Sequence, residues 1–254
     1  MKNSLSEVND MERLAKRIRT IAPSQTLAIS AKAKAMKAAG ESVVNFGVGE
    51  PDFPTPEYIV DAGVKALREG KTKYTPSAGL PDLRRAVCEK FKRDNGLDYE
   101  PSQIIVSNGA KHSIFNVCYA LVDEGDEVII PAPYWLTYPE VVKTCGGVPV
   151  YVEGAKENAF KITPEQLEAA ITPKTKLLIF NSPCNPTGAV YSEAEVRALA
   201  AVCEKHEIFV LSDEIYEKLV YGKTKPFSMA AVSDKMKELT ITVNGVSKTF
   251  AMTG

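Results

Sequence analysis

Histidine is scarce in this 254-residue sequence, which holds only His112 and His206, far apart in the chain. Two distant histidines exclude a metal cluster built on imidazole ligands. The five cysteines are an odd number, are widely spaced and form no C-x-x-C pair, at Cys88, Cys118, Cys145, Cys184 and Cys203. This spacing excludes a disulfide framework and a zinc site, and it fits the reducing cytoplasm.

Long apolar runs and an excess of one charge are also absent. No stretch approaches the ~18 consecutive apolar residues that a membrane-spanning helix needs, and the first 19 residues are too polar for a secretion signal. With 31 basic and 32 acidic residues the formal net charge is −1. We therefore expect a cytoplasmic protein with no metal and no nucleic-acid or membrane partner.

Helix-like and strand-like segments alternate along the chain, which predicts an α/β fold with a mostly parallel sheet. Residues 1–20 read as a charged arm or a short helix. Helices are expected over 27–39, 57–69, 80–94, 111–122 and 193–206, the last with a Ser192-x-x-Glu195 capping box. Strands are expected over 103–107, 126–133, 147–153, 176–181, 208–214 and 239–244.

Polar residues follow the ends of most of these strands. They are Asn108 and Gly109, Tyr134 and Trp135, Asn181 to Asn185, Asp213, and Ser247 with Lys248. In an open parallel sheet, ligands bind outside the carboxyl ends of the strands. If the strands are neighbours, these residues converge on one crevice, and this is the main physical argument for a site.

Each of these residues also has an ordinary structural interpretation. Gly109 opens a strand-to-helix turn, which can bind phosphate at the helix N-terminus or be a plain tight turn. Asp213 at a buried strand end needs a cationic or donor partner, such as a protonated pyridine nitrogen, or it is a helix N-cap. Lys248 lies among small residues, where burial makes its amine nucleophilic, or it extends to solvent. Trp135 can stack on a flat cofactor or cover the edge of the sheet.

The segment from Asn181 to Gly188 is more specific. It contains two prolines in the order Asn-Ser-Pro-Cys-Asn-Pro-Thr-Gly. Prolines restrict the backbone, so Asn185 between them is held in a fixed pose in which its amide can bind a ligand.

Together these residues resemble the class I aminotransferases of pyridoxal 5′-phosphate (PLP) fold type I. The resemblance is strongest to the branch of bacterial and plant aspartate aminotransferases, some of which also accept prephenate. It runs from about residue 23 to the last residue, through VNFGVGEPDFPTP, GKTKYTPSAGLPDLRRA, SNGAKHSIFN, PYWLTYPE, NSPCNPTGAVY, SDEIYEKLVY and TVNGVSKTFAMTG. It implies a three-layer α/β/α fold.

The resemblance also implies roles for residues of the crevice. Lys248 would hold PLP as a Schiff base and move the proton of the substrate Cα. Asp213 would pair with the ring nitrogen of the cofactor. Tyr216 and Asn185 would hydrogen-bond its phenolic oxygen, and Trp135 would stack on its ring and lie beside the substrate.

Further roles concern the cofactor phosphate and the substrate. The backbone amides of Gly109, Ala110 and Lys111 would hold the phosphate. Tyr74 would reach the phosphate of a neighbouring subunit, which implies a homodimer with shared active sites. Gly49 and Asn185 would lie against the α-carboxylate of the substrate.

Lys111, Ser24 and Thr26 would help to hold a second carboxylate. The expected activity is therefore transfer of the amino group of aspartate, or another dicarboxylic amino acid, to 2-oxoglutarate in amino-acid biosynthesis. Two alternatives stay open: another PLP-dependent amino-acid enzyme of the same fold, and a catalytically inactive module of this fold.

The resemblance further divides the chain. Residues 1–50 would form an N-terminal arm and part of a small domain, and residues 51–254 a large PLP-binding domain that is incomplete at its C-terminal end. In relatives the final string continues to an arginine that binds the phosphate, and a later domain supplies an arginine for the substrate carboxylate. We expect the chain to lack the C-terminal small domain and, by itself, to be weak or inactive as a catalyst.

Overall fold

The computed structural model describes residues 13–47 and 49–254, so the first twelve residues of the arm or short helix expected over residues 1–20 lie outside these ranges. A parallel sheet forms the centre of the described chain, with the strand order β2-β1-β3-β4-β5. The strands are β1 (Glu127–Ala132), β2 (Val148–Glu153), β3 (Thr175–Asn181), β4 (Phe209–Asp213) and β5 (Thr240–Val243). β3 is almost continuously apolar because helices cover both of its faces.

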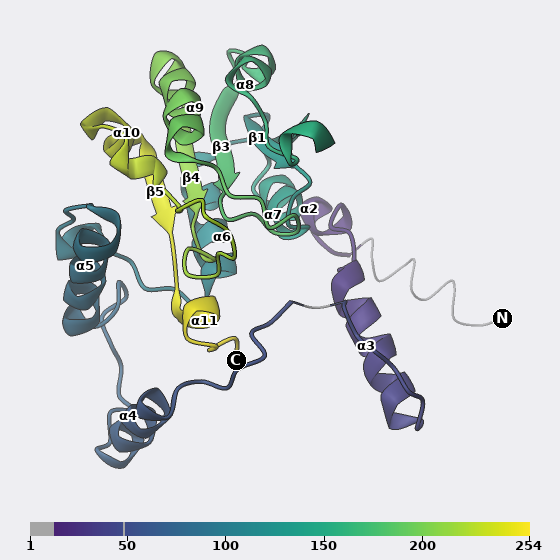
Figure 1. The fold of residues 1–254 in the computed structure, drawn as a ribbon, viewed down its shortest axis with the longest axis vertical. Coiled ribbons are helices and arrows are strands. Elements are labelled where there is room, and N and C mark those ends of the chain that lie inside the picture. Colours follow the sequence, from purple (N-terminus) through teal and green to yellow (C-terminus); the bar gives the residue numbers. More distant parts are fainter. Residues whose placement is uncertain (1–12, 48) are drawn as a thin grey trace.

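Helices pack on both faces of this sheet, as Figure 1 shows. Against one face lie α8 (Pro164–Ala170), α9 (Glu193–His206) and α10 (Asp234–Leu239), where Leu199 and Met236 meet Ile129 and Phe180. Against the other lie α6 (Ala110–Leu121) and α7 (Thr137–Thr144). Alternate residues of β1, β3 and β4 point to opposite cores, so the expected three-layer α/β/α fold is confirmed.

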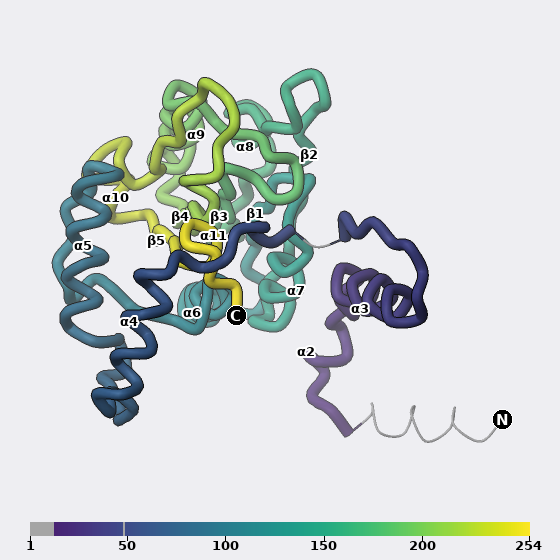
Figure 2. The backbone as a smooth tube through the Cα atoms, turned by 60° about the horizontal axis from the view of Figure 1, so that its bottom comes forward, coloured from purple at the N-terminus to yellow at the C-terminus, as the bar shows by residue number. Residues whose placement is uncertain are grey.

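The N-terminal segments lie outside these layers. They are α2 (Lys16–Arg19), α3 (Gln25–Ala38), α4 (Glu57–Arg68) and α5 (Pro81–Asn95). Figures 1 and 2 both show α3 apart from the sheet. In Figure 2 the chain before α4 crosses close to the short C-terminal helix α11 (Val246–Thr249), where Thr55 donates to the Ala251 carbonyl oxygen at 2.8 Å. Within the described ranges, no helix has the length and apolar character to cross a membrane.

Most elements agree with the sequence-based expectation. α3, α4, α5 and α9 occupy the expected helical ranges, and α3 is followed by Gly40 at φ +86°. Ser192 caps α9 through a reciprocal capping box with Glu195. The helices α7, α8 and α10 were not anticipated, because each has only six to eight residues and shows too little periodicity.

The expected strand over residues 103–107 is wrong. Pro101–Gln103 form a single 3-10 turn, and residues 104–107 run on without pairing to any of the five strands. The Val106 amide donates instead to the carbonyl oxygen of Ala78, at 3.0 Å. An apolar β-branched run becomes a strand only where a neighbouring backbone supplies its hydrogen bonds, and sequence pattern alone does not reveal that neighbour.

Candidate active site

The ends of the central strands lie side by side. Asn181, the last residue of β3, pairs in register with Asp213, the last residue of β4. Asp213 in turn pairs with Val243, the last residue of β5. The polar residues that follow β3, β4 and β5 therefore leave the sheet at the same end, as the strand pattern predicts for these three strands.

Asp213 is a buried carboxyl group held by two neutral donors. Its Oδ2 accepts from the Tyr138 hydroxyl at 2.8 Å, and its Oδ1 accepts from the Ile215 amide at 3.2 Å. Burial raises the pKa of Asp213 to about 6, and the two hydrogen bonds oppose this rise. Within the described ranges, no lysine, arginine or histidine forms an ion pair with it. The site thus presents a buried acid without a cation.

A chain of hydrogen bonds ties the 182–188 loop to Asp213. The Asn181 side chain donates to the Asp213 carbonyl oxygen at 2.9 Å, and its Oδ1 accepts from the Asn185 amide at 2.8 Å. The Ser182–Pro183 and Asn185–Pro186 peptide bonds that flank the loop are cis. The hydrogen bond between the Asn185 amide and Asn181 places Asn185 beside the end of β3.

Tyr216 faces the same place from the loop after β4. Burial raises the pKa of Tyr216, as does the nearby charge of Asp213, while a hydrogen bond with the Asn185 side chain lowers it. Tyr216 and Asn185 are thus direct partners, and their expected role toward the cofactor stays a prediction.

Lys248 lies in α11, the short helix that follows β5. Its Nζ donates to the Gly49 carbonyl oxygen at 3.3 Å and lies 5.9 Å from the centre of the Tyr216 ring. Burial lowers the pKa of Lys248, and the charge of Glu50 opposes this effect. A half-buried amine with a lowered pKa is more often neutral and hence more nucleophilic than an exposed lysine.

The N-terminus of α6 forms another part of the site. Gly109 begins the helix at φ +79°, and a Cβ atom built on it would meet no atom within 4 Å, so the space above it is open. Its own amide donates to the Ser107 carbonyl oxygen at 2.8 Å. The amides of Ala110 and Lys111, in the first turn, have no acceptor within the helix and are the donors best suited to a phosphate.

Trp135 is half-buried just after β1, and the ammonium group of Lys111 lies 5.3 Å from the centre of its ring. The Tyr138 ring packs edge-on against Trp135, with 5.6 Å between centroids. Sequence reasoning missed Tyr138. Tyr138 follows Trp135 by three residues, and this spacing places two side chains on the same face of a helix. That spacing is the sequence signal that could have revealed Tyr138.

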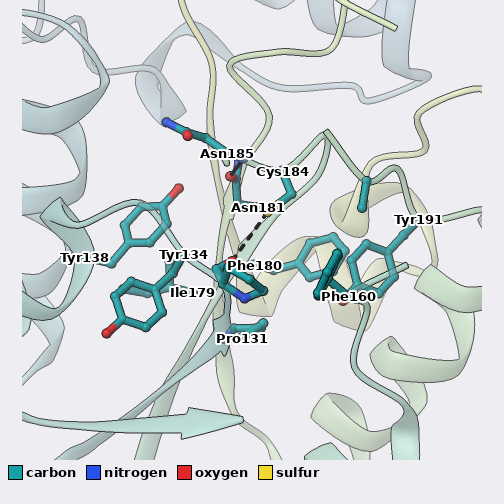
Figure 3. Close-up of a pocket in the computed structure, with 12 residues that line it drawn as sticks. Pro131, Tyr134, Tyr138, Phe160, Ile179, Phe180, Asn181, Cys184, Asn185 and Tyr191 are labelled. Carbon is teal, nitrogen blue, oxygen red and sulfur yellow. Dashed lines mark hydrogen bonds between the residues drawn. The ribbon is translucent and has the colours of Figure 1, made fainter. Parts of the chain in front are cut away.

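A small pocket adjoins the loop that carries Asn185. Figure 3 shows Tyr134 and Tyr138 on one side of this pocket and Phe160 and Tyr191 on the other. These aromatic rings line the pocket next to Asn185. We assign no separate ligand to this pocket.

The roles of all the expected site residues stay predictions, including those of Tyr74, Ser24 and Thr26. Tyr74 is fully exposed. Ser24 accepts from the Leu27 amide at 3.3 Å and so caps α3, on which Thr26 also lies. The roles of Ser24 and Thr26 toward a substrate are untested by this arrangement, in which α3 stands apart from the sheet (Figure 2).

The chemical groups of these residues suit the groups of PLP. A buried carboxylate without a cation suits a protonated ring nitrogen, and a half-buried lysine suits an aldehyde. The open helix N-terminus at Gly109 suits a phosphate. Among the described side chains, no group of three or more His, Cys, Asp or Glu residues could hold a metal ion.

Comparison with known proteins places this arrangement in a family. The family model of aminotransferase class I and II matches residues 41–254, and the chain belongs to this family, whose members use PLP. It is 58% identical over 242 residues to an aspartate aminotransferase from Bacillus subtilis, a match that covers 95% of this chain and 62% of the relative. It is 51% identical over 241 residues to a probable aspartate/prephenate aminotransferase from Aquifex aeolicus, covering 95% and 61%.

Solved structures agree with the computed fold. The aspartate aminotransferase of Thermus thermophilus with maleate superimposes with a TM-score of 0.92 at 48% identity, covering 95% of this chain and 62% of that one. The aspartate aminotransferase of Rhizobium meliloti gives 0.91 at 46% identity, covering 95% and 61%. The chain thus spans about three fifths of the length of the relatives that it matches.

Proposed function

We propose that this chain carries the cofactor site of an aspartate aminotransferase, which transfers the amino group of a dicarboxylic amino acid to 2-oxoglutarate. The observation that carries the proposal is that a buried carboxyl group, Asp213, and a half-buried amine, Lys248, both lie near Tyr216. Asp213 is a buried acid without a cation. Lys248 is a half-buried amine with a lowered pKa, and its Nζ lies 5.9 Å from the centre of the Tyr216 ring. Tyr216 connects the two groups, because the charge of Asp213 acts on it and raises its pKa. Relatives named aspartate aminotransferase support the choice of reaction.

Each residue contributes a separate step. PLP, when bound, supplies a ring that accepts the electrons released from the substrate Cα. The negative charge of Asp213 keeps the ring nitrogen protonated, and Tyr216 with Asn185 orients the phenolic oxygen. The amine of Lys248 removes the proton from the substrate Cα, and its lowered pKa favours the neutral form that this step requires.

The preference for a dicarboxylic substrate rests on Lys111. Its ammonium group lies beside Trp135 at the open end of α6, where it can pair with a second carboxylate. Ser24 and Thr26 would join it if α3 moves toward the crevice, and Gly49 would lie against the α-carboxylate. The names of several relatives include prephenate, and we propose that oxo acid as a further acceptor.

Visible spectroscopy tests the cofactor and the reaction together. After reconstitution with PLP, the purified protein should show the absorption of the lysine-bound cofactor. One equivalent of L-aspartate should convert this band to that of the pyridoxamine form, and 2-oxoglutarate should restore it. A band that no amino acid changes would contradict the transaminase reaction, and the absence of any band would contradict the cofactor site.

A homodimer is the second part of the proposal. Large apolar side chains are exposed along the N-terminal segments, at Phe46, Phe53, Tyr58, Leu67 and Tyr74. α4 is amphipathic yet buries none of its residues within the chain. Exposed apolar surface of this kind marks an interface. A second copy would cover it and bring Tyr74 to the cofactor phosphate of its neighbour.

Sedimentation velocity at micromolar concentration tests the dimer. We expect a species of twice the chain mass of 27.6 kDa. A Leu67→Asp substitution places a charge on the exposed face of α4 and should shift the population toward monomer, whereas Lys156→Asp, on the surface between β2 and α8, should not. A wild-type chain that sediments as a monomer would refute this part of the proposal.

The location is the third part. All five cysteines are free in the structure, and none is paired with another. Free, partly or fully buried thiols suit a reducing compartment. We propose a cytoplasmic enzyme of amino-acid biosynthesis.

A further inference from the structure

Tyr138 connects two residues of the proposed site and has no role assigned so far. It is 2% exposed at the start of α7, and its hydroxyl donates to the Asp213 carboxylate at 2.8 Å. Its ring packs edge-on against Trp135, and its amide donates to the Trp135 carbonyl oxygen at 3.0 Å. One side chain therefore contacts both the acid expected under the ring nitrogen and the aromatic residue expected over the ring face.

The hydroxyl of Tyr138 can only act as a neutral donor here. Burial raises the pKa of Tyr138 well above its ordinary value, and the charge of Asp213 raises it further. The hydroxyl thus stays protonated throughout the physiological range and donates a hydrogen bond to Oδ2 of Asp213. Oδ1 is held by the Ile215 amide, so both oxygens are fixed in direction.

We propose that Tyr138 is a positioning residue that holds Asp213 in the orientation and charge state required by a cationic ring nitrogen; this rests on the proposed function. A carboxylate with one donor on each oxygen keeps further lone pairs free for a third. Rotation of the carboxylate would break one of the two bonds. The hydroxyl also stabilises the negative form of Asp213 in a place where burial favours the neutral form.

Other groups around Asp213 are also neutral donors or weak acids. They are Tyr216 on the loop after β4 and Cys184 on the loop after β3, both of which act electrostatically on this cluster. Lys248 of α11 lies against the Tyr216 ring rather than in an ion pair with Asp213. Tyr138 is therefore the one side chain in the described ranges with a hydrogen bond to the Asp213 carboxylate.

The decisive variant is Tyr138→Phe, which removes the hydroxyl and keeps the ring. Without this donor the pKa of Asp213 should rise by about one further unit. The unfolding equilibrium constant, measured by urea titration without cofactor, should then grow about tenfold more between pH 5 and pH 8 than it does in the wild type. The sign follows because an acid with a raised folded pKa destabilises the protein once it must ionise.

Two comparisons separate this role from simple packing. In an Asp213→Asn background the extra pH dependence of Tyr138→Phe should vanish, because no carboxyl group remains to titrate. The matched control is Tyr191→Phe, since the Tyr191 hydroxyl is also buried but accepts from the Ile162 amide. This control should lose stability equally at both pH values. An equal loss for Tyr138→Phe at both pH values would overturn the proposal.

The remaining outcomes are also informative. If Tyr138→Phe does not fold, recovery of folding in the double variant with Asp213→Asn supports the coupling, and failure of both refutes it. With PLP added, the Kd of Tyr138→Phe relative to wild type should rise as the pH falls from 8 to 6, and a constant ratio counts against the role. A wild-type chain that binds no PLP refutes the proposed function alone, because the urea titrations need no cofactor.

Discussion

A Lys248→Ala variant should lose the visible absorption of the lysine-bound cofactor entirely. No other side chain in the described site offers an amine with a lowered pKa at the crevice. The rate of amino transfer should fall by about 10²- to 10⁴-fold, the range that is typical when a group that moves the substrate proton is removed. Absorption spectra of the reconstituted variant and single-turnover measurements with L-aspartate check both effects.

Two further substitutions make the Lys248 result specific. Lys248→Arg keeps a positive charge but supplies no nucleophilic amine, so it should also lose the band. Lys143→Ala removes another half-buried lysine, which pairs with Glu140 in α7, and should keep the band. A band of normal intensity in Lys248→Ala would place the covalent attachment elsewhere and would remove the basis of the proposed reaction.

The strand ends show how far sequence reasoning reaches in this protein. An apolar run followed by a polar residue predicts both the strand and the position of its end, and for Asn181 and Asp213 the register of β3 and β4 agrees. The placement of Lys248 follows for the same reason, although the lysine lies in a short helix rather than directly on the strand. Because parallel strands all end at the same side of the sheet, residues that follow different strands in the sequence come together in space.

Contacts between segments that are far apart in the sequence could not be predicted from local sequence patterns. Tyr138 reaches Asp213 across 75 positions, and nothing in either local pattern indicates that hydrogen bond. The failed strand over residues 103–107 has the same origin, because its backbone partner is a property of the fold and not of the segment. Burial of Glu214, which follows Asp213, is likewise invisible to pattern because acidic residues are usually exposed.

Glu214 should make the stability of the protein strongly dependent on pH. Its side chain is buried, and its Oε1 accepts from the hydroxyls of Ser212 at 2.9 Å and Ser228 at 2.7 Å. Burial raises the pKa of Glu214 to about 7, and the charge of Glu217 adds to this rise. The two serine hydrogen bonds and Lys90 oppose it.

The sign follows from the direction of this pKa. The folded state binds the Glu214 proton more tightly than the unfolded chain, so the stabilising contribution is complete below the ordinary pKa of 4.5. It is lost as the pH rises from there to about 7. Between pH 5 and pH 8 the share of Glu214 amounts to about 2–3 kcal/mol of the free energy of unfolding.

Glu214→Gln should therefore flatten the pH profile of urea unfolding by about that amount, because the amide accepts the two serine hydrogen bonds without ionising. The variant should be more stable than the wild type at pH 8 and close to it or less stable at pH 5. Glu165→Gln, which changes an exposed acid of α8 whose pKa is lowered, should leave the slope nearly unchanged. A wild-type profile that is already flat between pH 5 and pH 8 would contradict the prediction, because it would mean that the pKa of Glu214 is not raised in the folded protein.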